Sequence, residues 1–379
     1  MDNSVSNNTP QTRLATRIMF LSAGMITAAW ASIIPFVKYN VQISDGVIGG
    51  LLLCLGAGAL AGMPLAGVWA GRIGCKRLLT ASVLSFAILF LLIPMMESIY
   101  SLAFTLFLFG MSIGLTDCAM NIQAVVVEKA SDKPLMSGFH GFYSLGGMAG
   151  ALVMTTQLSL DVPVMLACVV TSILVVAMLL YSLTGLLNNA ENSSGPIMIM
   201  PRSIVVLIGL VCSILFLSEG TVLDWSGIYL TEFMNIETSS AGLGVASFSV
   251  AMTIGRLTGD KIVSSMGPRI VINAGALTAI FGFLLTLHTD TWQLALAGYA
   301  LIGFGCANIV PIMFSATGKQ TVMPESMAVT AVSTLGYAGV LAGPALVGFG
   351  AELFSLPVSL HIIVGLMVLA LLISLKIRV

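Results

Sequence analysis

The sequence predicts an all-α membrane protein in which twelve transmembrane helices form two pseudo-symmetric six-helix bundles. Three observations predict this fold. Apolar residues make up 58% of the 379 residues and charged residues only 8%, which leaves too little polar surface for a chain folded in water. Its uncharged stretches reach about 20 residues, enough to cross a hydrocarbon core about 30 Å thick. Finally, a basic motif beginning at Gly67 recurs in degenerate form at Gly255, as in transporters built from repeats.

Helices are expected rather than strands, because an open sheet would leave backbone groups unpaired in lipid and a barrel would need alternating segments of about ten residues. Breaks at charges, proline and glycine divide the chain into twelve apolar segments. They cover residues 18–38, 46–70, 78–96, 100–127, 136–158, 162–184, 203–230, 240–259, 270–288, 292–317, 327–351 and 357–375.

The polar stretch from Asn188 to Pro196 (NNAENSSGP) separates six of these segments from the other six. We therefore predict a cytoplasmic tail at residues 1–17, one bundle at 18–187, a cytoplasmic linker at 188–202 and a second bundle at 203–379. With this arrangement, fourteen of the fifteen Lys and Arg residues fall on one side and only Lys38 on the other. The positive-inside rule then places both termini in the cytoplasm.

The motif from Gly67 to Arg77 (GVWAGRIGCKR) resembles the signature loop of the major facilitator superfamily, Gly-x-Leu-x-Asp-Arg-x-Gly-Arg-Arg. The resemblance implies that this loop and its second copy form a cytoplasmic gate closed by charge pairs. Gly71 occupies the acidic position, so the first copy lacks one acid of that lock. The implied gate residues are Gly67, Arg72, Lys76 and Arg77 in the first copy and Arg256, Asp260 and Lys261 in the second.

Two departures argue against a drug antiporter. Such exporters in the superfamily typically carry an Arg in the fourth span and a Gly-Pro signature in the fifth, and this chain has neither. The run from Glu219 to Leu230 (EGTVLDWSGIYL) is instead similar to that of a bacterial subgroup that includes the rhizopine-associated membrane protein MosC. This resemblance implies an inner-membrane protein with sugar or inositol-like substrates.

Acidic residues within the apolar segments are the first candidates for function, because a charge in the membrane costs about 2.5 to 3.5 kcal/mol to insert. We expect no Lys or Arg at a comparable depth to neutralise them. Asp117 shares a helical stripe with Gly110, Gly114 and Asn121, which fits a substrate or proton site and a structural role equally well. Glu219 is the stronger candidate for proton coupling or substrate binding, since alternating access of water would let it gain and lose a proton.

Other residues complete the predicted passage. Asp224 and Trp225 lie near the outer end of the seventh span and are predicted to form an outer gate or an interface anchor. Aromatic rings could stack on a sugar, and amides could hydrogen-bond to a polyol. Packing between helices is the alternative for each, and it is the more usual role for a lone histidine such as His140. This set comprises Trp30, His140, Tyr143, Asn308 and Tyr337, together with Asn121.

The sequence gives no sign of a cofactor or a metal. The glycine-rich run from Gly56 to Gly62 (GAGALAG) lies inside an apolar helix and predicts close helix packing rather than a nucleotide loop. The six cysteines have no metal-ligand spacing and are interpreted as packing residues. Because the three histidines fall on different spans or sides, we expect no enzyme active site.

Together these features predict a secondary active transporter that moves a sugar, polyol or amino sugar by alternating access, driven by protons. The expected partners are that small-molecule solute, protons and the lipid bilayer. A net charge of −1 gives no indication of a nucleic-acid partner, and a monomer is expected. An exporter of hydrophobic or cationic compounds stays open, favoured by the unpaired acids and 22 methionines. A transporter-like solute sensor is the alternative from another class.

Overall fold

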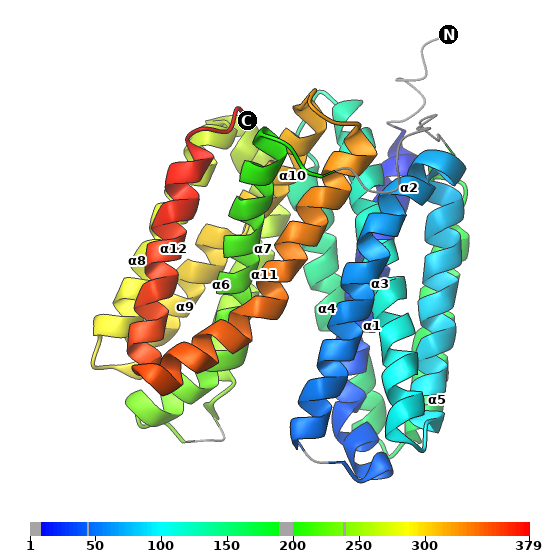
Figure 1. Cartoon of the computed structure of the whole chain (residues 1–379), viewed down its shortest axis with the longest axis horizontal. Coiled ribbons are helices and arrows are strands. Elements are labelled where there is room, and N and C mark those ends of the chain that lie inside the picture. The colour runs from blue at the N-terminus through cyan, green and yellow to red at the C-terminus, as the bar shows by residue number, and fades with distance from the viewer. Residues whose placement is uncertain (1–8, 44, 189–199, 238–239) are drawn as a thin grey trace. The chain divides into compact units, whose positions relative to one another are not determined.

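The computed structural model describes residues 9–43, 45–188, 200–237 and 240–379, and these are almost wholly helical (Figure 1). The all-α prediction is confirmed. The helices are α1 (Pro10–Val41), α2 (Asp45–Leu92), α3 (Ile99–Lys129), α4 (Met136–Ser159), α5 (Val164–Ser182), α6 (Ile204–Phe233), α7 (Leu243–Met266), α8 (Pro268–His288), α9 (Trp292–Cys306), α10 (Ile309–Lys319), α11 (Glu325–Leu353) and α12 (Leu356–Ser374).

Several helices begin at the residues that the sequence provides for this purpose. The hydroxyl of Thr9 accepts a hydrogen bond from the N–H of Thr12 at 3.1 Å, and Pro10 follows it as the first residue of α1. Ser98 caps α3 in the same way, with its hydroxyl 3.2 Å from the N–H of Ser101. Such caps satisfy backbone N–H groups that have no partner within the helix.

The helices account for twelve membrane crossings. Among the described residues, nine helical stretches are long and apolar enough to span a bilayer, and one of these, Gly49–Met95, has 47 residues. That length suffices for two crossings at about 20 residues each. α4 and α7, with 24 residues each, supply the remaining two, while α9 and α10 together form a single stretch (Trp292–Lys319).

The predicted loop between the second and third spans is a kink of one residue. Gly74 has φ 81° and ψ 157°, and helix continues on both sides of it. The repeat has the same turn at Gly267, with φ 81° and ψ 150°, between α7 and α8. Only glycine adopts such a backbone conformation readily, and a Cβ atom on Gly74 would also lie 2.6 Å from the carbonyl oxygen of Asn188. The duplicated motif therefore encodes a duplicated turn.

The contacts within the chain divide it into two compact units. Unit 1 comprises Met1–Ser131, Phe142–Met200 and Pro324–Thr330, and unit 2 comprises Asp132–Gly141, Pro201–Met323 and Ala331–Val379. The first residues of α4 thus belong to unit 2, and the first residues of α11 belong to unit 1. The predicted linker at 188–202 lies largely outside the described residues, as does much of the predicted tail at 1–17.

Glycines allow helices within unit 1 to pack backbone against backbone. A Cβ atom on Gly58 or Gly62 of α2 would overlap main-chain carbonyl groups of Phe107 or Met111 in α3. Gly110 on α3 faces the carbonyl of Leu55 in α2 in the same way. The prediction that the run Gly56–Gly62 serves helix packing is confirmed, and small residues are what such close contact between membrane helices requires.

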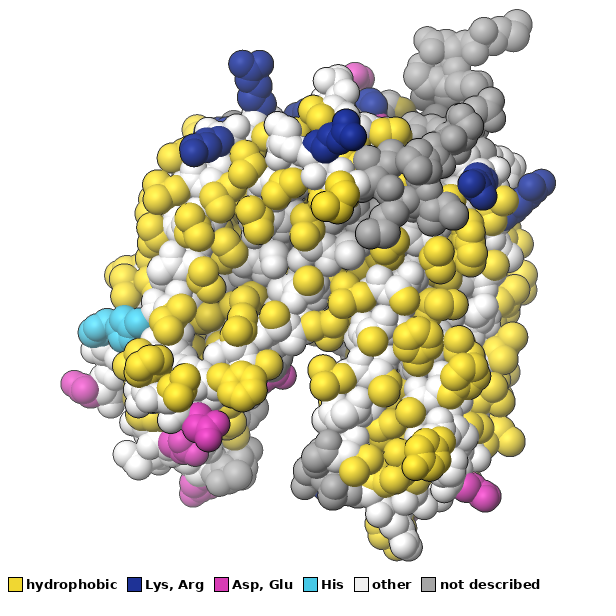
Figure 2. All heavy atoms as spheres, viewed as in Figure 1, with side chains coloured by type: hydrophobic (Ala, Val, Ile, Leu, Met, Phe, Trp, Pro, Cys, Tyr) yellow, Lys and Arg dark blue, Asp and Glu magenta, His cyan; other side chains and the backbone are white. Residues whose placement is uncertain are grey.

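The surface is what a chain in lipid would present. In Figure 2, hydrophobic side chains cover the sides of each unit, Lys and Arg gather at one end, and most of the visible Asp and Glu lie at the other. Large apolar side chains such as Phe104 and Phe281 are 65% and 58% exposed. No disulfide joins the six cysteines, all of which are described; five are buried and Cys54 is partly buried.

Candidate functional site

Unit 2 contains an ion pair between two of the predicted residues. Glu219 projects from α6 and Arg256 from α7, and Nη2 of Arg256 lies 3.4 Å from Oε2 of Glu219. The arginine side chain is 7% exposed and the glutamate side chain 23%. The expectation that no basic residue would neutralise Glu219 is wrong. Arg256, expected in a cytoplasmic loop, lies within α7, because that helix continues for ten further residues to Met266.

Asn308 fixes the backbone next to this pair. It lies at the break between α9 and α10, and its Nδ2 donates a hydrogen bond to the carbonyl oxygen of Gly255 at 3.1 Å. It is 5% exposed, and its Oδ1 accepts no hydrogen bond from any described residue. Gly259 gives it room, since a Cβ atom there would overlap Oδ1. Asn308 therefore connects the break between α9 and α10 to α7, which is one of its two predicted roles. Its Oδ1 is left as an acceptor.

The beginning of α4 carries two further contacts in unit 2. The carboxylate of Asp260 accepts a hydrogen bond from the N–H of Gly138 at 3.0 Å, where a negative charge at a helix N-terminus is favourable. His140 is 9% exposed, and its ring centroid lies 5.7 Å from that of Phe314. His140 thus packs at a helix interface, which was the more usual of its two interpretations.

In unit 1, Asp117 and Asn121 lie one turn apart on α3. Nδ2 of Asn121 donates to the carbonyl oxygen of Asp117 at 2.9 Å, and the buried Oδ1 of Asn121 has no donor among the described residues. Asp117 is partly exposed. Within the described residues, no hydrogen bond or ion pair involves the Asp117 carboxyl group. Gly110 and Gly114, which share its stripe, pack against Leu55 and Ala59 of α2.

The predicted aromatic residues differ in how accessible they are. Trp30 is 6% exposed and lies edge-on to Phe109, with ring centroids 6.3 Å apart. In this structure it packs within unit 1, and its contact with a solute stays a prediction. Tyr143 of unit 1 and Tyr337 of unit 2 are both partly exposed, so they are better placed than Trp30 to meet a solute.

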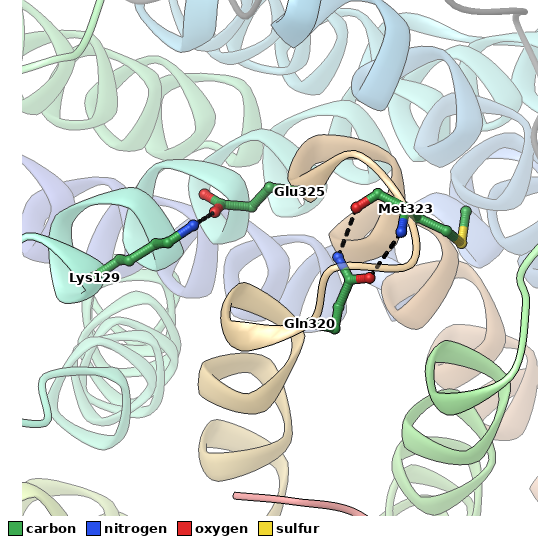
Figure 3. A network of polar contacts seen from close by, with 4 residues as sticks. All are labelled: Lys129, Gln320, Met323 and Glu325. Carbon is green, nitrogen blue, oxygen red and sulfur yellow. Dashed lines mark hydrogen bonds and ion pairs between the residues drawn. The ribbon is translucent and has the colours of Figure 1, made fainter.

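A salt bridge that the sequence did not predict joins the end of α3 to the start of α11, both in unit 1. Nζ of Lys129 lies 2.6 Å from Oε2 of Glu325, and Figure 3 shows the two side chains pointing toward each other. The glutamate side chain is 11% exposed and the lysine 60%. Opposite charges in equivalent loops of the two repeats are the signal that could have indicated this pair.

Separately, in unit 2, the amide of Gln320 orders the connection that follows α10. Its Nε2 donates to the carbonyl oxygen of Met323 at 2.8 Å, and its Oε1 accepts from the N–H groups of Val322 and Met323 at 2.8 and 2.9 Å. Figure 3 shows the contacts with Met323. These three hydrogen bonds hold the residues that follow α10 against the side chain of Gln320.

The basic residues of the first motif make no charge lock among the described residues. Arg72 and Arg77 are exposed and form no ion pair there, and Lys261 of the second copy is exposed as well. Lys76 is partly buried, and its N–H donates to the carbonyl oxygen of Leu187 at 2.8 Å. Gly67 packs beneath Thr330 and leaves no room for a side chain.

Trp225, one of the two predicted outer-gate residues, lines a small cavity in unit 2. Asp224 is exposed, whereas the indole Nε1 of Trp225 is buried. Trp225, Ser226 and Tyr299 line a cavity of about 10 Å³, and their buried polar atoms have no hydrogen-bond partner among the described residues. A volume of this size accommodates about one water molecule.

No group of three or more His, Cys, Asp or Glu side chains that could hold a metal ion occurs in the described part of the chain. The candidate residues fall into two separate sets. Unit 1 holds Asp117, Asn121 and Tyr143, and unit 2 holds Glu219, Arg256, Asn308 and Tyr337. Asn308 lies at the break between α9 and α10, and the others lie within helices.

Known proteins resemble this chain over nearly its whole length. A family model described as the Major Facilitator Superfamily matches residues 18–196. An uncharacterised MFS-type transporter of Yersinia pestis is 42% identical over 351 residues, which cover 92% of this chain and 91% of that protein. Membrane protein MosC of Rhizobium meliloti is 30% identical over 353 residues, which cover 93% of this chain and 86% of MosC.

Solved structures of transporters share the fold. The fucose:proton symporter FucP of E. coli aligns with a TM-score of 0.78 at 17% identity, covering 96% of this chain and 98% of FucP. A bacterial homologue of the iron transporter ferroportin aligns with a TM-score of 0.76 at 14% identity, covering 97% of this chain and 99% of that one. These structures show the fold alone. The sequence relatives, together with the twelve crossings and the duplicated glycine turn, show that the protein is a multi-pass membrane transporter that belongs to the major facilitator superfamily.

Proposed function

We propose that this protein is a secondary active transporter that moves a small polar solute, a sugar, polyol or amino sugar, across the bacterial inner membrane. Transport is coupled to protons and proceeds by alternating access, with both chain termini in the cytoplasm. The single observation that carries the proposal is the ion pair of Glu219 and Arg256 within the membrane-spanning part of unit 2.

The geometry of the pair supports a role in proton coupling. Its single contact of 3.4 Å is longer than the 2.7 to 2.9 Å usual for a charge-assisted hydrogen bond. Glu219 is also the more exposed partner, so a proton can reach it. Once Glu219 is protonated, its attraction for Arg256 falls, and the guanidinium can donate to an oxygen of the solute. Proton binding and solute binding are then linked through one side chain.

The remaining site residues fit a solute that carries hydroxyl or amino groups. Asp117 offers a carboxylate, and Asn121 and Asn308 each offer an amide oxygen that accepts no hydrogen bond from the described residues. All three are acceptors, and hydroxyl and amino groups are donors that would satisfy them. Tyr143 and Tyr337 can add an aromatic surface for a sugar ring. FucP is a fucose:proton symporter by its title, but its likeness concerns the fold, so the substrate class rests on these residues.

Two contacts at helix ends support a cytoplasmic gate. Lys129 and Glu325 pair at 2.6 Å, and Asp260 accepts from the N–H of Gly138 at 3.0 Å. In our proposal both contacts hold when the cytoplasmic side is closed and break when it opens. The gate implied by the signature motif then depends on Asp260 and on the Lys129–Glu325 pair, while Arg72 and Arg77 remain exposed.

Asp117 favours one alternative, an exporter of cationic compounds. A carboxylate inside the membrane with no basic partner among the described residues would attract an organic cation. In that case Asp117→Asn should abolish transport of a labelled organic cation, whereas sugars and polyols should produce no movement at all.

The test uses purified protein in vesicles under an imposed pH gradient. Candidate sugars, inositols, amino sugars and organic cations are added in turn, and an enclosed dye reports proton movement. We expect a solute of the first three classes to move protons, and Glu219→Gln to abolish that movement. Glu232→Gln, an exposed acid on the same helix, is the matched control and should behave like the wild type. Unchanged coupling in Glu219→Gln would remove Glu219 from the mechanism.

A further inference from the structure

Two histidines from different helices of unit 2 lie side by side on its surface. His288 is the last residue of α8, and His361 lies near the beginning of α12. Their ring centroids are 5.3 Å apart and their ring planes meet at 87°. Both residues are exposed, and Figure 2 shows histidine side chains at the surface of this unit close to Asp and Glu side chains. The proposed transport mechanism uses neither histidine.

The main chain holds both rings in the same way. Nδ1 of His288 lies 3.0 Å from the carbonyl oxygen of Leu284, and Nδ1 of His361 lies 2.8 Å from that of Pro357, in each case one helical turn earlier. Because a carbonyl oxygen only accepts, each Nδ1 carries the hydrogen, and each neutral ring presents the lone pair of Nε2. Histidines that bind metals are oriented by this same type of hydrogen bond.

The distance between the rings suits one ion shared by both. Imidazole nitrogens bind Zn²⁺ at about 2.0 to 2.1 Å in tetrahedral geometry, so two rings on one ion have their centroids about 5 Å apart. The observed 5.3 Å matches that separation, and perpendicular ring planes are compatible with it. Since the described residues contain no group of three metal-binding side chains, water or an external ligand would complete the coordination.

We propose that His288 and His361 form a two-histidine site for a divalent transition-metal ion such as Zn²⁺, Cu²⁺ or Ni²⁺. Imidazole suits these ions, whereas Mg²⁺ and Ca²⁺ select oxygen ligands. Nearby carboxylates, including the exposed Asp290 two residues after His288, favour the approach of a cation. A bound ion would tie the end of α8 to the beginning of α12 and would stabilise unit 2 by an amount that rises with the logarithm of the ion concentration above its Kd.

The experiment uses the full-length protein in detergent, purified without a polyhistidine tag. Calorimetric titration with Zn²⁺ should show one ion per chain, and thermal unfolding should shift upward with Zn²⁺, return with a chelator and stay unchanged with Mg²⁺. His288→Gln and His361→Gln should each weaken Zn²⁺ binding by about tenfold or more. Thr291→Ala, an exposed change in the connection after α8, should bind Zn²⁺ like the wild type.

Three results would overturn the site. They are no saturable binding of Zn²⁺ by the wild type, wild-type binding by both histidine variants, or a loss confined to one of them. Size-exclusion chromatography of each variant shows that a loss of binding is not a loss of folding. Because the readout is metal binding, the outcome is independent of whether the transport proposal holds.

Discussion

The ion pair of Glu219 and Arg256 lowers the cost of placing two charges in the membrane. Each side chain would be costly in the membrane alone, and the pair reduces that cost because each neutralises the other. The contact is single, 3.4 Å long and partly open on the glutamate side. Such a pair stabilises the folded protein only while both partners are charged, which agrees with the role in proton coupling proposed above.

A double-mutant cycle tests this dependence. Arg256→Met leaves Glu219 without its partner and should lower the free energy of unfolding by about 2 kcal/mol. The double variant Glu219→Gln with Arg256→Met removes both charges and should recover a large part of that loss. Unfolding in mixed detergent micelles measures the three variants. Additive losses would mean that the two side chains do not interact.

Sequence reasoning found both members of this pair but not the pair itself. Glu219 stood out because a lone acid in an apolar segment is rare. Arg256 was assigned to a loop because the segment containing it ends among charged residues, and hydropathy cannot tell how far a helix continues beyond the lipid. The contact itself joins residues 37 positions apart on two helices, and no periodicity within one helix predicts such a partner.

At the scale of helices, glycine decides how closely neighbours approach. α2 and α3 meet through Gly58, Gly62 and Gly110, at each of which a Cβ atom would overlap a main-chain carbonyl group of the facing helix. The spacing of small residues predicted this contact correctly. The break between α9 and α10 was not predicted. Asn308 at this break donates a hydrogen bond to Gly255 of α7, which is a tertiary contact that no pattern within one helix indicates.

Gly110→Ala tests the packing of these two helices. The added methyl group has to push α3 away from the carbonyl oxygen of Leu55, and overpacking of this kind costs about 1 to 3 kcal/mol. Gly365→Ala in α12 is the matched control, since a Cβ atom there meets nothing within 4 Å. The control should be neutral or stabilising by up to about 1 kcal/mol. Thermal unfolding in detergent compares them, and equal stabilities would refute the packing role.

At the scale of the whole molecule, repetition is the organising feature. The glycine turns at Gly74 and Gly267 share a φ of 81°. The helices α4 and α11 are equivalent in the two halves. The start of α4 belongs to unit 2 and the rest of α4 to unit 1, whereas the start of α11 belongs to unit 1 and the rest of α11 to unit 2. The twelve crossings and the duplicated turn were predictable from hydropathy and the repeated motif. The exchanged segments were not, because they depend on contacts between residues far apart in the chain.

The Lys129–Glu325 pair offers a test of gating at this scale. Lys129→Glu and Glu325→Lys each place like charges together and should speed opening of the cytoplasmic side while costing about 1 kcal/mol of stability or less. The double charge reversal should restore wild-type behaviour. Solute exchange in vesicles and thermal unfolding measure the two effects. Lys319→Glu, at an exposed lysine ending α10, is the control.

If the effects of the double reversal on solute exchange and stability equal the sum of the effects of the two single variants, the pair has no role in gating. Rescue by the double variant is the result that a merely solvated surface charge would not give. High salt should also weaken this pair in the wild type and so speed opening of the cytoplasmic side. The reason is that the lysine is 60% exposed, so its attraction to Glu325 is screened.

The contact between α2 and α3 also bears on how this sequence can change over generations. Every amino acid other than glycine carries a Cβ atom, so no single replacement at Gly58 or Gly110 preserves the spacing of the two backbones. Single substitutions at these positions are therefore disfavoured, and a change in one helix requires a compensating change in the other. We therefore expect natural variation to accumulate on the lipid-facing sides and to be least at this contact between α2 and α3.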